Sequence, residues 1–298
     1  MSNFSQNERY VLSLFSPNNE FVYGGVRYKV VESGKPTSSK GEPKTDIYVM
    51  SISLDNSKYL EFKISFKQDN ADFLENKMTA ERAEQIFGPN WQNIIESFTS
   101  SIDQKFATRN YIFKNKEGRT SAGSITLGWR FELVNKSGGG LSGLANLTPE
   151  QVLEVYAGRK LAASKKNAIV NGRIIEDSGV ANCMINCDVS SLQSIQDAID
   201  SIISIEDFAQ NNPNVYFVCK ALNYRSFDDK IEGNRPLSVF INWEVVDNKL
   251  VPNLVYSNPL LTKGNEVRDK LKESLNLLKI SNTNDINEDN FASFQIVN

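Results

Sequence analysis

The sequence predicts a mixed α/β protein of the α+β kind, because two different hydrophobic spacings alternate along the chain. In residues 58–67 every second residue is apolar, which is the spacing of a half-buried strand. In residues 91–106 apolar residues recur four apart, which is the spacing of an amphipathic helix. The 298 residues are enough to bury a sizeable core, as one large domain or as two ordinary ones.

Composition predicts a globular protein of the cytoplasm. The chain is 40% hydrophobic and 23% charged, which are values of globular domains. No apolar run approaches the length of a membrane span, and the first residues lack the basic and apolar regions of a signal peptide, so no membrane partner is expected. Cys183, Cys187 and Cys219 are an odd, low count, which predicts reduced thiols rather than a disulfide framework.

The absence of histidine narrows the chemistry that this chain can perform. It excludes a Ser-His-Asp catalytic triad, a Cys-His catalytic dyad, a nuclease with a catalytic histidine, and zinc or iron sites with histidine ligands. Carboxylate, lysine and hard-metal chemistry remain. The net charge of −3 argues against a protein that coats nucleic acid indiscriminately, but it leaves room for a local basic channel.

The chain begins with a predicted helix and a predicted strand pair. Residues 5–15 predict the helix, since Ser5 and Glu8 have the spacing of a capping box. Residues 21–31 predict strands with an early break at two glycines. Residues 33–44 are rich in Gly, Pro, Ser and Lys and predict a mobile loop. Beside a phosphodiester site such a loop would clamp DNA, and otherwise it is a solvated linker.

A predicted hairpin follows, with strands at 47–54 and 58–67 and a turn at 55–57. Apolar and polar residues alternate along its second strand, and the two kinds therefore lie on opposite faces. The apolar face is Leu60, Phe62, Ile64 and Phe66, and the polar face is Glu61, Lys63, Ser65 and Lys67. Asp46 stands at the start of the first strand, and we expect the turn to fold it back towards Glu61 and Lys63.

Asp46, Glu61 and Lys63 are residue types that hydrolysis of a phosphodiester requires. Mg²⁺ prefers oxygen ligands and usually takes one or two protein carboxylates, so Asp46 and Glu61 are the candidate metal ligands. A metal held there would polarise a phosphoryl oxygen and make its bound water a better nucleophile. Lys63 would orient or deprotonate that water, or stabilise the charge developing on phosphorus.

The same residues resemble a known nuclease motif. Pro43-Lys44-Thr45-Asp46, followed after fourteen residues by Glu61-Phe62-Lys63, is similar to the PD-(D/E)xK signature, although the proline and aspartate are not adjacent. The resemblance, over about residues 1–106, implies a restriction-endonuclease-like core in which helices flank a central mixed sheet. It implies DNA cleavage with Mg²⁺, for which Mn²⁺ can substitute, with Asp46 and Glu61 on the metal and Lys63 as the catalytic lysine. Further candidate accessory residues are Glu8, Glu42 and Lys67.

Two other interpretations remain open for the hairpin. Alternating charged and apolar residues are typical of any solvated edge strand, and the D-x(n)-ExK spacing also occurs by chance. The chain would then be a catalytically silent DNA-binding or protein-interaction module with the same fold. Alternatively it is a structural or regulatory protein without a nucleic-acid partner, in which the hairpin is only a sheet edge.

The rest of the chain predicts helices and strands without a second catalytic motif. We expect helices at 79–87, 91–106, 148–166, 191–208 and 266–280, and strands at 111–116, 124–134, 215–222, 237–247 and 250–256. Tyr111, Phe113 and Trp129 interleave with basic residues, as on a surface that stacks nucleic-acid bases, although strand alternation produces the same pattern.

These features predict four regions. Residues 1–136 form a catalytic region, 137–147 a Gly-rich hinge, 148–281 an α+β region for DNA recognition or dimerisation, and 282–298 a polar, frayed tail. The expected partners are double-stranded DNA and a second copy of the chain. The candidate DNA contacts are Lys40, Lys44, Arg159, Lys160, Lys165 and Lys166. The last four equally suit the dipole at the end of a helix over 148–166.

Overall fold

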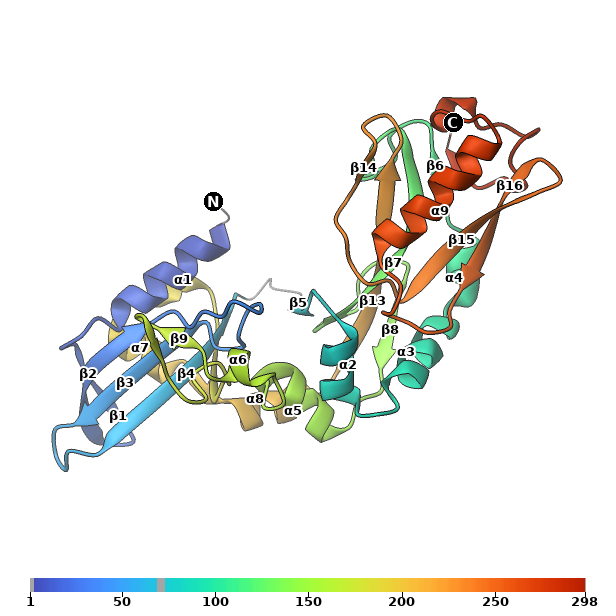
Figure 1. Ribbon diagram of the computed structural model, residues 1–298. Coiled ribbons are helices and arrows are strands. Elements are labelled where there is room, and N and C mark those ends of the chain that lie inside the picture. Colours follow the sequence, from blue (N-terminus) through green and yellow to red (C-terminus); the bar gives the residue numbers. More distant parts are fainter. Residues whose placement is uncertain (1–2, 69–72, 298) are drawn as a thin grey trace. The chain divides into compact units, whose positions relative to one another are not determined.

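The computed structural model describes residues 3–68 and 73–297, which fold into two compact units (Figure 1). Unit 1 combines Met1–Asp72 with Leu147–Pro213, and unit 2 combines Phe73–Asn146 with Asn214–Asn298. This division differs from the linear one expected from the sequence, and strand pairing is the reason. β11 (Cys183–Asn186) pairs with β4 (Tyr59–Lys67), and β13 (Val215–Arg225) pairs with β7 (Ser124–Val134), so each unit needs strands from both halves.

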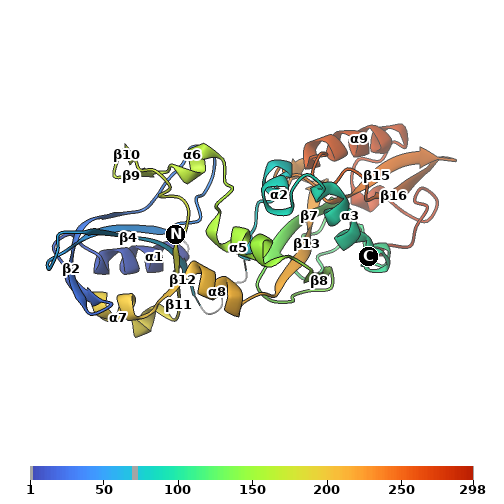
Figure 2. The same ribbon diagram turned by 90° about the horizontal axis from the view of Figure 1, so that it is seen from below.

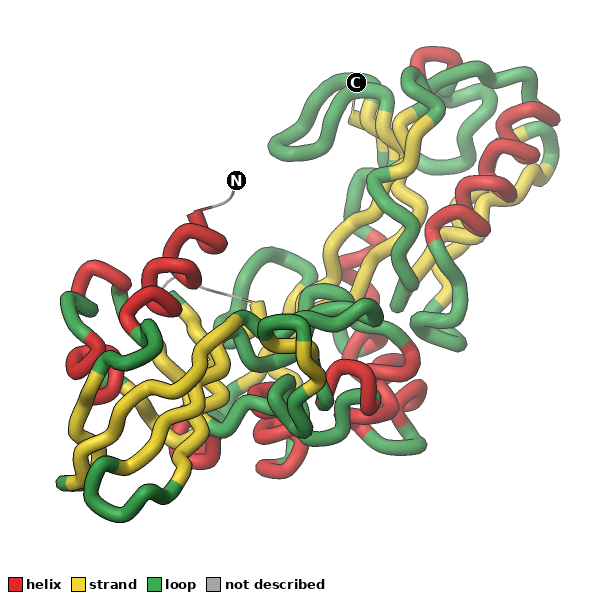
Figure 3. Tube along the Cα trace, turned by 60° about the vertical axis from the view of Figure 1, so that its left-hand side comes forward, coloured by secondary structure: helices red, strands yellow, loops and turns green. Residues whose placement is uncertain are grey.

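Both units are mixed α/β, with curled sheets flanked by helices (Figure 3). In unit 1 the sheet has the order β1-β2-β3-β4-β11-β12. Its other strands are β1 (Glu20–Tyr23), β2 (Val26–Gly34), β3 (Ile47–Ser53) and β12 (Ile202–Ser204). Neighbouring strands are antiparallel except β4 and β11, which run parallel. The predicted hairpin is therefore confirmed, and it lies in the middle of the sheet rather than at an edge.

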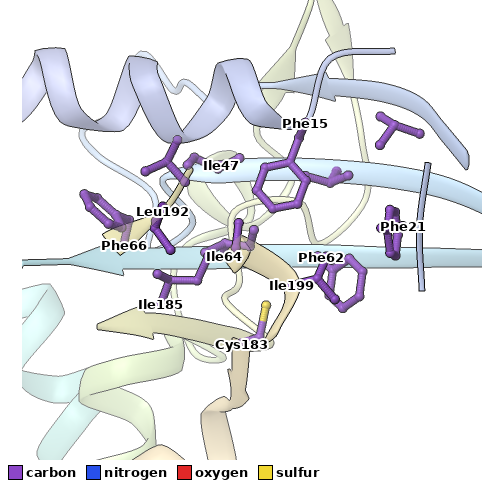
Figure 4. Close-up of a cluster of buried hydrophobic side chains, with 14 residues drawn as sticks. Phe15, Phe21, Ile47, Phe62, Ile64, Phe66, Cys183, Ile185, Leu192 and Ile199 are labelled. Carbon is purple, nitrogen blue, oxygen red and sulfur yellow. The ribbon is translucent and has the colours of Figure 1, made fainter. Parts of the chain in front are cut away.

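One face of this sheet packs against α1 (Asn3–Leu14) and α7 (Ile195–Asp200). The apolar residues of β3 and β4 meet Val11 of α1 and Phe15 just after it, and both of these side chains are fully buried (Figure 4). Each buried side chain of this size contributes about 1.5–3 kcal/mol relative to exposure. The face predicted to be apolar is thus the core face, and the polar residues of β4 are left on the opposite one.

On the side of the opposite face lie α6 (Ala163–Lys166) and the hairpin of β9 (Ile169–Val170) and β10 (Arg173–Ile174), which follow α5 (Pro149–Ala157) in the chain (Figure 2). α8 (Ile205–Asn211) packs on α5. The predicted helix over 148–166 starts where expected, because Thr148 and Gln151 form a capping box. It ends early at Gly158, which adopts the left-handed conformation with φ 73° and stops the helix.

The predicted helix over 191–208 is also interrupted. A 3₁₀ turn at Val189–Ser191 precedes α7, and residues 202–204 leave the helix to form β12 along β11. Ser194 and Ser204 cap α7 and α8 by accepting backbone N–H groups, so two short helices replace one long one. The isoleucine spacing predicted one continuous helix. That spacing carries no information on helix starts, and here the two serine caps begin separate helices.

Unit 2 is built around the long pair of β7 and β13. Its sheet has the order β14-β13-β7-β15-β16, with β5 and β6 on β7, β8 on β13, and β17 on β6. The remaining strands are β5 (Phe73–Glu75), β6 (Ile112–Phe113), β8 (Ser142–Ala145), β14 (Lys230–Ile231), β15 (Val239–Val246), β16 (Lys249–Val255) and β17 (Ile296–Val297). The helices are α2 (Ala80–Phe87), α3 (Trp91–Ser100), α4 (Asp103–Ala107) and α9 (Gly264–Leu277).

Three expectations for unit 2 are wrong. The Gly-rich segment is not a simple hinge, because its residues 142–145 form β8 along β13. The tail is not frayed, because Thr283–Asp285 forms a 3₁₀ turn, Phe291 is buried, and β17 pairs with β6. The proposed stacking surface is also wrong, because Tyr111, Phe113 and Trp129 are buried in the core. Within the described ranges, no helix has the length and apolarity needed to cross a membrane.

Candidate active site

The position of Asp46 is set by the register of the hairpin. Ile47 pairs with Ile64 across the β3–β4 ladder, and the backbone N–H of Asp46 donates to the carbonyl oxygen of Ile64 at 2.8 Å. Asp46 is one residue before Ile47, and it therefore lies opposite Ser65, which is one residue after Ile64. Residues opposite each other on a ladder share a face, so Asp46 lies on the polar face of β4.

The Asp46 carboxylate makes three contacts with consecutive residues of β4. Its Oδ2 accepts the backbone N–H of Phe66 at 2.8 Å and the hydroxyl of Ser65 at 3.4 Å. The Nζ of Lys67 lies 3.5 Å from the same oxygen. The side chains of Asp46 and Lys67 are 21% and 31% exposed, so the pair is half-buried and open to small molecules. Asp46, Ser65 and Lys67 thus form one local group.

Glu61 does not join this group, which corrects the expectation from the sequence. It lies opposite Met50, four residues before Ser65 along β4. At a strand rise of roughly 3.3 Å per residue, that places it roughly 13 Å along the strand from the position opposite Asp46. Asp46 and Glu61 share a face, but the two residues are too far apart along the sheet to act as a pair of ligands for one metal ion.

Glu61 instead accepts a hydrogen bond from the hydroxyl of Tyr48, whose residue is fully buried. Burial raises the pKa of Tyr48 well above its ordinary value, and the hydrogen bond to Glu61 raises it further. Lys63 lies opposite Tyr48 on the ladder. Over the described part of the chain its ammonium group has no hydrogen bond or ion pair. Lys63 therefore lies between the Asp46 group and the Glu61–Tyr48 pair without a contact to Asp46.

Asn182, which the sequence did not single out, holds the backbone of β4 beside these residues. Its Oδ1 accepts the N–H of Lys63 at 2.8 Å, and its Nδ2 donates to the carbonyl oxygen of Glu61 at 3.0 Å. Its own N–H donates to the carbonyl oxygen of Lys63 at 3.0 Å. Because Asn182 directly precedes β11, it fixes the start of the parallel pairing.

A second lysine near the start of this hairpin, Lys35, contacts an acidic residue of α1. Lys35 follows the end of β2, and its Nζ contacts the Glu8 carboxylate at 2.5 Å. Burial lowers the pKa of Lys35, but the Glu8 hydrogen bond and the charges of Glu8, Asp46 and Glu42 outweigh it and raise that pKa overall. Of the candidate accessory residues, Lys67 contacts Asp46 directly, whereas Glu8 contacts Lys35 and Glu42 acts on Lys35 through its charge.

The β9–β10 hairpin packs against the backbone next to Lys35. A Cβ on the preceding residue, Gly34, would lie 2.8 Å from Asn171 Oδ1 and 2.8 Å from Val170 Cγ1, so the β9–β10 hairpin packs closely there. Thr37 and Ile169 exchange two backbone hydrogen bonds, at 2.9 and 2.8 Å. The loop at 35–44 is thus paired with β9 and is not the free linker that its composition suggested.

The same loop meets the basic residues that follow α5. The N–H of Lys44 donates to the carbonyl oxygen of Gly179 at 2.9 Å, and the N–H of Gly179 donates to that of Lys166 at 2.7 Å. A Cβ on Gly41 would lie 3.3 Å from Lys165 Cε. We call residues 35–44 and 158–180 together the basic layer. It carries eight basic and three acidic residues in a chain of net charge −3.

Not all of the candidate DNA contacts in the basic layer are available. Arg159 pairs with Glu206, and Lys166 pairs with Asp177 at 3.4 Å. Among the described residues, the ammonium groups of Lys40, Lys160 and Lys165 form no ion pair. Arg173 pairs with Glu32 at 2.5 Å, and its guanidinium is the main cause of the lowered pKa of that carboxyl group.

The group of Asp46, Ser65 and Lys67 contains one carboxylate that is a candidate Mg²⁺ ligand. Across residues 3–68 and 73–297, no group of three or more His, Cys, Asp or Glu side chains could hold a metal ion. Mg²⁺ needs only one or two protein carboxylates, because it keeps several waters. Asp46 alone can supply one such carboxylate, whereas Asp46 and Glu61 lie too far apart along β4 to act as a pair.

Comparisons of the chain with models of known protein families, with curated proteins and with solved structures found no match in any of the three.

Proposed function

We propose that this protein is a Mg²⁺-dependent deoxyribonuclease of restriction-endonuclease-like fold, with its catalytic centre at Asp46, Ser65 and Lys67. The layering of unit 1 supports the fold, because a mixed sheet has α1 and α7 on one face and α6 with the β9–β10 hairpin on the side of the other (Figure 2). Ser65-Phe66-Lys67 stands, relative to Asp46, where the resemblance led us to expect Glu61-Phe62-Lys63.

The observation that carries the proposal is the contact of the Asp46 carboxylate with Lys67, 3.5 Å apart on a half-buried polar face. An aspartate and a lysine held next to each other by strand pairing are the two groups that hydrolysis of a phosphodiester needs. Their positions follow from the β3–β4 ladder and not from flexible loops, so the arrangement is pre-organised.

Each residue then has one task. Asp46 would hold Mg²⁺, which when bound would supply a polarised phosphoryl oxygen and a more acidic water. The Lys67 ammonium is placed to orient the attacking water and to stabilise negative charge developing on phosphorus. The water oxygen forms the new bond to phosphorus and gives a proton to solvent, while the bond from phosphorus to the leaving sugar oxygen breaks and that oxygen takes up a proton from solvent. The Ser65 hydroxyl and the Phe66 N–H hold the Asp46 carboxylate in position.

The basic layer supports DNA as the substrate. It contains the loop that leads directly into Asp46, and backbone hydrogen bonds join its two segments. Lysine contacts to phosphate supply most of the sequence-independent affinity for DNA. Lys40, Lys160 and Lys165 carry charges that form no ion pair with any acidic side chain among the described residues.

The test is incubation of the protein with plasmid and linear DNA in Mg²⁺, in Mn²⁺ and in EDTA. We expect cleavage that needs the metal and that Asp46→Asn abolishes. Asp55→Asn, in the turn of the same hairpin, is the matched control and should cleave normally. Absence of cleavage by the wild-type protein on every DNA tested, with either metal, would contradict the proposal.

One observation favours the alternative, a catalytically silent DNA-binding module. In the centre at Asp46 the acidic position of the motif is occupied by Ser65, which is a weaker metal ligand than a carboxylate. The module predicts salt-sensitive DNA binding without cleavage, and binding that Asp46→Asn leaves unchanged.

A further inference from the structure

The last turns of α9 border a cavity in unit 2. The cavity has a volume of about 290 Å³, close to the size at which small-ligand sites begin. Its apolar lining consists of Tyr224 of β13 together with Leu275 and Ile280, and all three residues are buried. A compact apolar group would therefore find a dry surface against which to pack.

The rest of the lining is polar and consists of Lys272, Asn276, Lys279 and Ser281. The first three are spaced four and three residues apart, so they follow one face of α9 to its end. Among the residues that the structure describes, the Lys279 ammonium, the Asn276 amide and the Ser281 hydroxyl form no hydrogen bond or ion pair. These groups are available to a ligand.

Asp229 fixes two groups of the lining in place. Its two carboxylate oxygens each lie 2.8 Å from the Nζ of Lys272, and its Oδ1 also accepts the hydroxyl of Tyr224 at 3.0 Å. Asp229 offsets the charge of Lys272 by this contact. It does not contact Lys279, so one positive charge at the cavity is left without a counter-ion.

A second carboxylate, that of Asp285, lies close to the cavity without lining it. It accepts the backbone N–H groups of Ser281 and Asn282 at 2.8 and 3.1 Å. These bonds hold Asp285 at the start of the 3₁₀ turn, as part of its capping box. The Asp285 carboxylate thus has a structural task, and Lys279 remains the unpaired charge of the lining.

Lys279 occupies a backbone position that favours glycine. Its φ is 56°, in the left-handed region. The N–H of Lys279 donates to the carbonyl oxygen of Asn276 at 3.0 Å, and that of Ile280 donates to Leu275 at 2.9 Å, so α9 ends in a Schellman motif. A side chain at this point of the motif costs free energy that glycine avoids. The helix dipole favours a cation here, but it gives no reason for a cavity beside that cation.

We propose that this cavity binds a small organic anion, with a phosphate or carboxylate group on a compact apolar body, and that Lys279 binds the charged group. The apolar body packs against Tyr224, Leu275 and Ile280, and Asn276 and Ser281 supply further hydrogen bonds. A charge-assisted hydrogen bond from Lys279 to the anion contributes more than a neutral one. This site belongs to unit 2 and does not depend on the proposed cleavage of DNA.

The experiment measures the affinity of the full chain for four compounds by NMR titration. Phenyl phosphate and benzoate have both the anion and the apolar body, inorganic phosphate has the anion alone, and benzyl alcohol has the body alone. We expect phenyl phosphate or benzoate to bind about tenfold more tightly than either partial compound, because only they use both parts of the lining. Comparison of phenyl phosphate with benzoate decides which anionic group the site prefers.

Three variants test the role of Lys279. Lys279→Gln removes the charge and should weaken binding of the preferred compound about tenfold, the loss expected for a hydrogen bond to a charged group. Lys279→Gly should weaken binding equally without lowering Tm, because glycine adopts the left-handed conformation without strain. Lys270→Gln, at an exposed position of the same helix, is the matched control and should bind like the wild type.

Several results would overturn the proposal. One is that the wild type binds none of the four compounds at millimolar concentrations. Another is that inorganic phosphate binds as tightly as phenyl phosphate and benzoate, which would show attraction of charge without a ligand site. A third is a lower Tm of Lys279→Gln with unchanged binding, which would mean that Lys279 serves only the helix end. If Lys279→Gln does not fold, the affinity of Lys279→Gly decides in its place.

Discussion

Asp46 lies opposite Ser65 across the β3–β4 ladder, and its carboxylate contacts Lys67 two residues further along the same strand. This register separates the polar face of β4 into two parts. One part contains Asp46, Ser65 and Lys67. The other contains Glu61, which is occupied with Tyr48. The first has the half-buried carboxylate and ammonium that we propose as the catalytic centre, and the second has a partly buried hydrogen bond to which we assign a structural role.

Tyr48→Phe should destabilise the protein without affecting cleavage. The change removes the donor to the Glu61 carboxylate, and removal of a hydrogen bond to a charged group costs about 1.5–3 kcal/mol. Denaturant unfolding at pH 7 measures the stability, and plasmid cleavage measures the activity. A loss of cleavage in folded Tyr48→Phe would show that the Glu61–Tyr48 pair belongs to the catalytic centre after all.

Tyr48 also predicts a change of stability at alkaline pH. Its pKa is raised in the folded state, so its contribution to stability is complete below the ordinary pKa of 10.0 and is lost as the pH rises above that value. The unfolding free energy of the wild type should therefore fall from about pH 10 upward. The fall should be less steep in Tyr48→Phe, and equal slopes for the two proteins would contradict the assignment.

Arg173→Ala should lower stability at neutral pH and make no difference in acid. The Arg173 guanidinium is the main cause of the lowered pKa of the Glu32 carboxyl group. A lowered pKa contributes stability above the ordinary value of 4.5, and that contribution disappears as the pH falls below it. Unfolding curves at pH 7 and at about pH 3 give the comparison. Arg27→Ala, an exposed arginine on the same strand as Glu32, is the control and should behave like the wild type at both pH values.

DNA binding should depend on the lysines of the basic layer. Replacing Lys40, Lys160 and Lys165 together by Gln should weaken binding of Asp46→Asn protein to duplex DNA in EDTA. It should also reduce the slope of log K against log salt by about 0.9 for each phosphate that the protein no longer neutralises. Fluorescence anisotropy at several salt concentrations measures both quantities. The matched variant replaces three exposed lysines of unit 2 by Gln, Lys116, Lys230 and Lys270, and an equal effect there would show that the basic layer is not the binding surface.

The sequence predicted the hairpin of unit 1 well because strand alternation and turn residues are local properties. Counting from the predicted turn at 55–57 places Asp46 opposite Phe66, which is one residue from its observed partner Ser65 and already far from Glu61. Ser53 and Lys58 close the turn, so the pairing runs back from there to Ile47 and Ile64 and brings Asp46 to Ser65. The spacing of the ExK motif predicted a site at Glu61 and Lys63. The register of the hairpin, however, is determined by its turn.

Other features could not be found from local patterns. Lys35 and Glu8 meet because β2 ends beside α1, and their contact spans 27 residues of sequence. Asn182 reaches Lys63 only because β11 returns to the first sheet after the chain has passed through unit 2.

The helices predicted over 148–166 and 191–208 were too long for a different reason. Gly158 and the serine caps end or start helices, whereas the hydrophobic spacing continues past them.

The most direct test of the centre compares the rates of Mg²⁺-dependent plasmid cleavage by Lys67→Ala and Lys63→Ala. The two lysines lie on the same strand and the same face, so each is a control for the other. Removal of a catalytic lysine should slow cleavage by about 10²- to 10⁴-fold. We predict that effect for Lys67→Ala and a near wild-type rate for Lys63→Ala. The opposite result, slow cleavage by Lys63→Ala with normal cleavage by Lys67→Ala, would contradict the centre at Asp46, Ser65 and Lys67 and return it to Glu61 and Lys63.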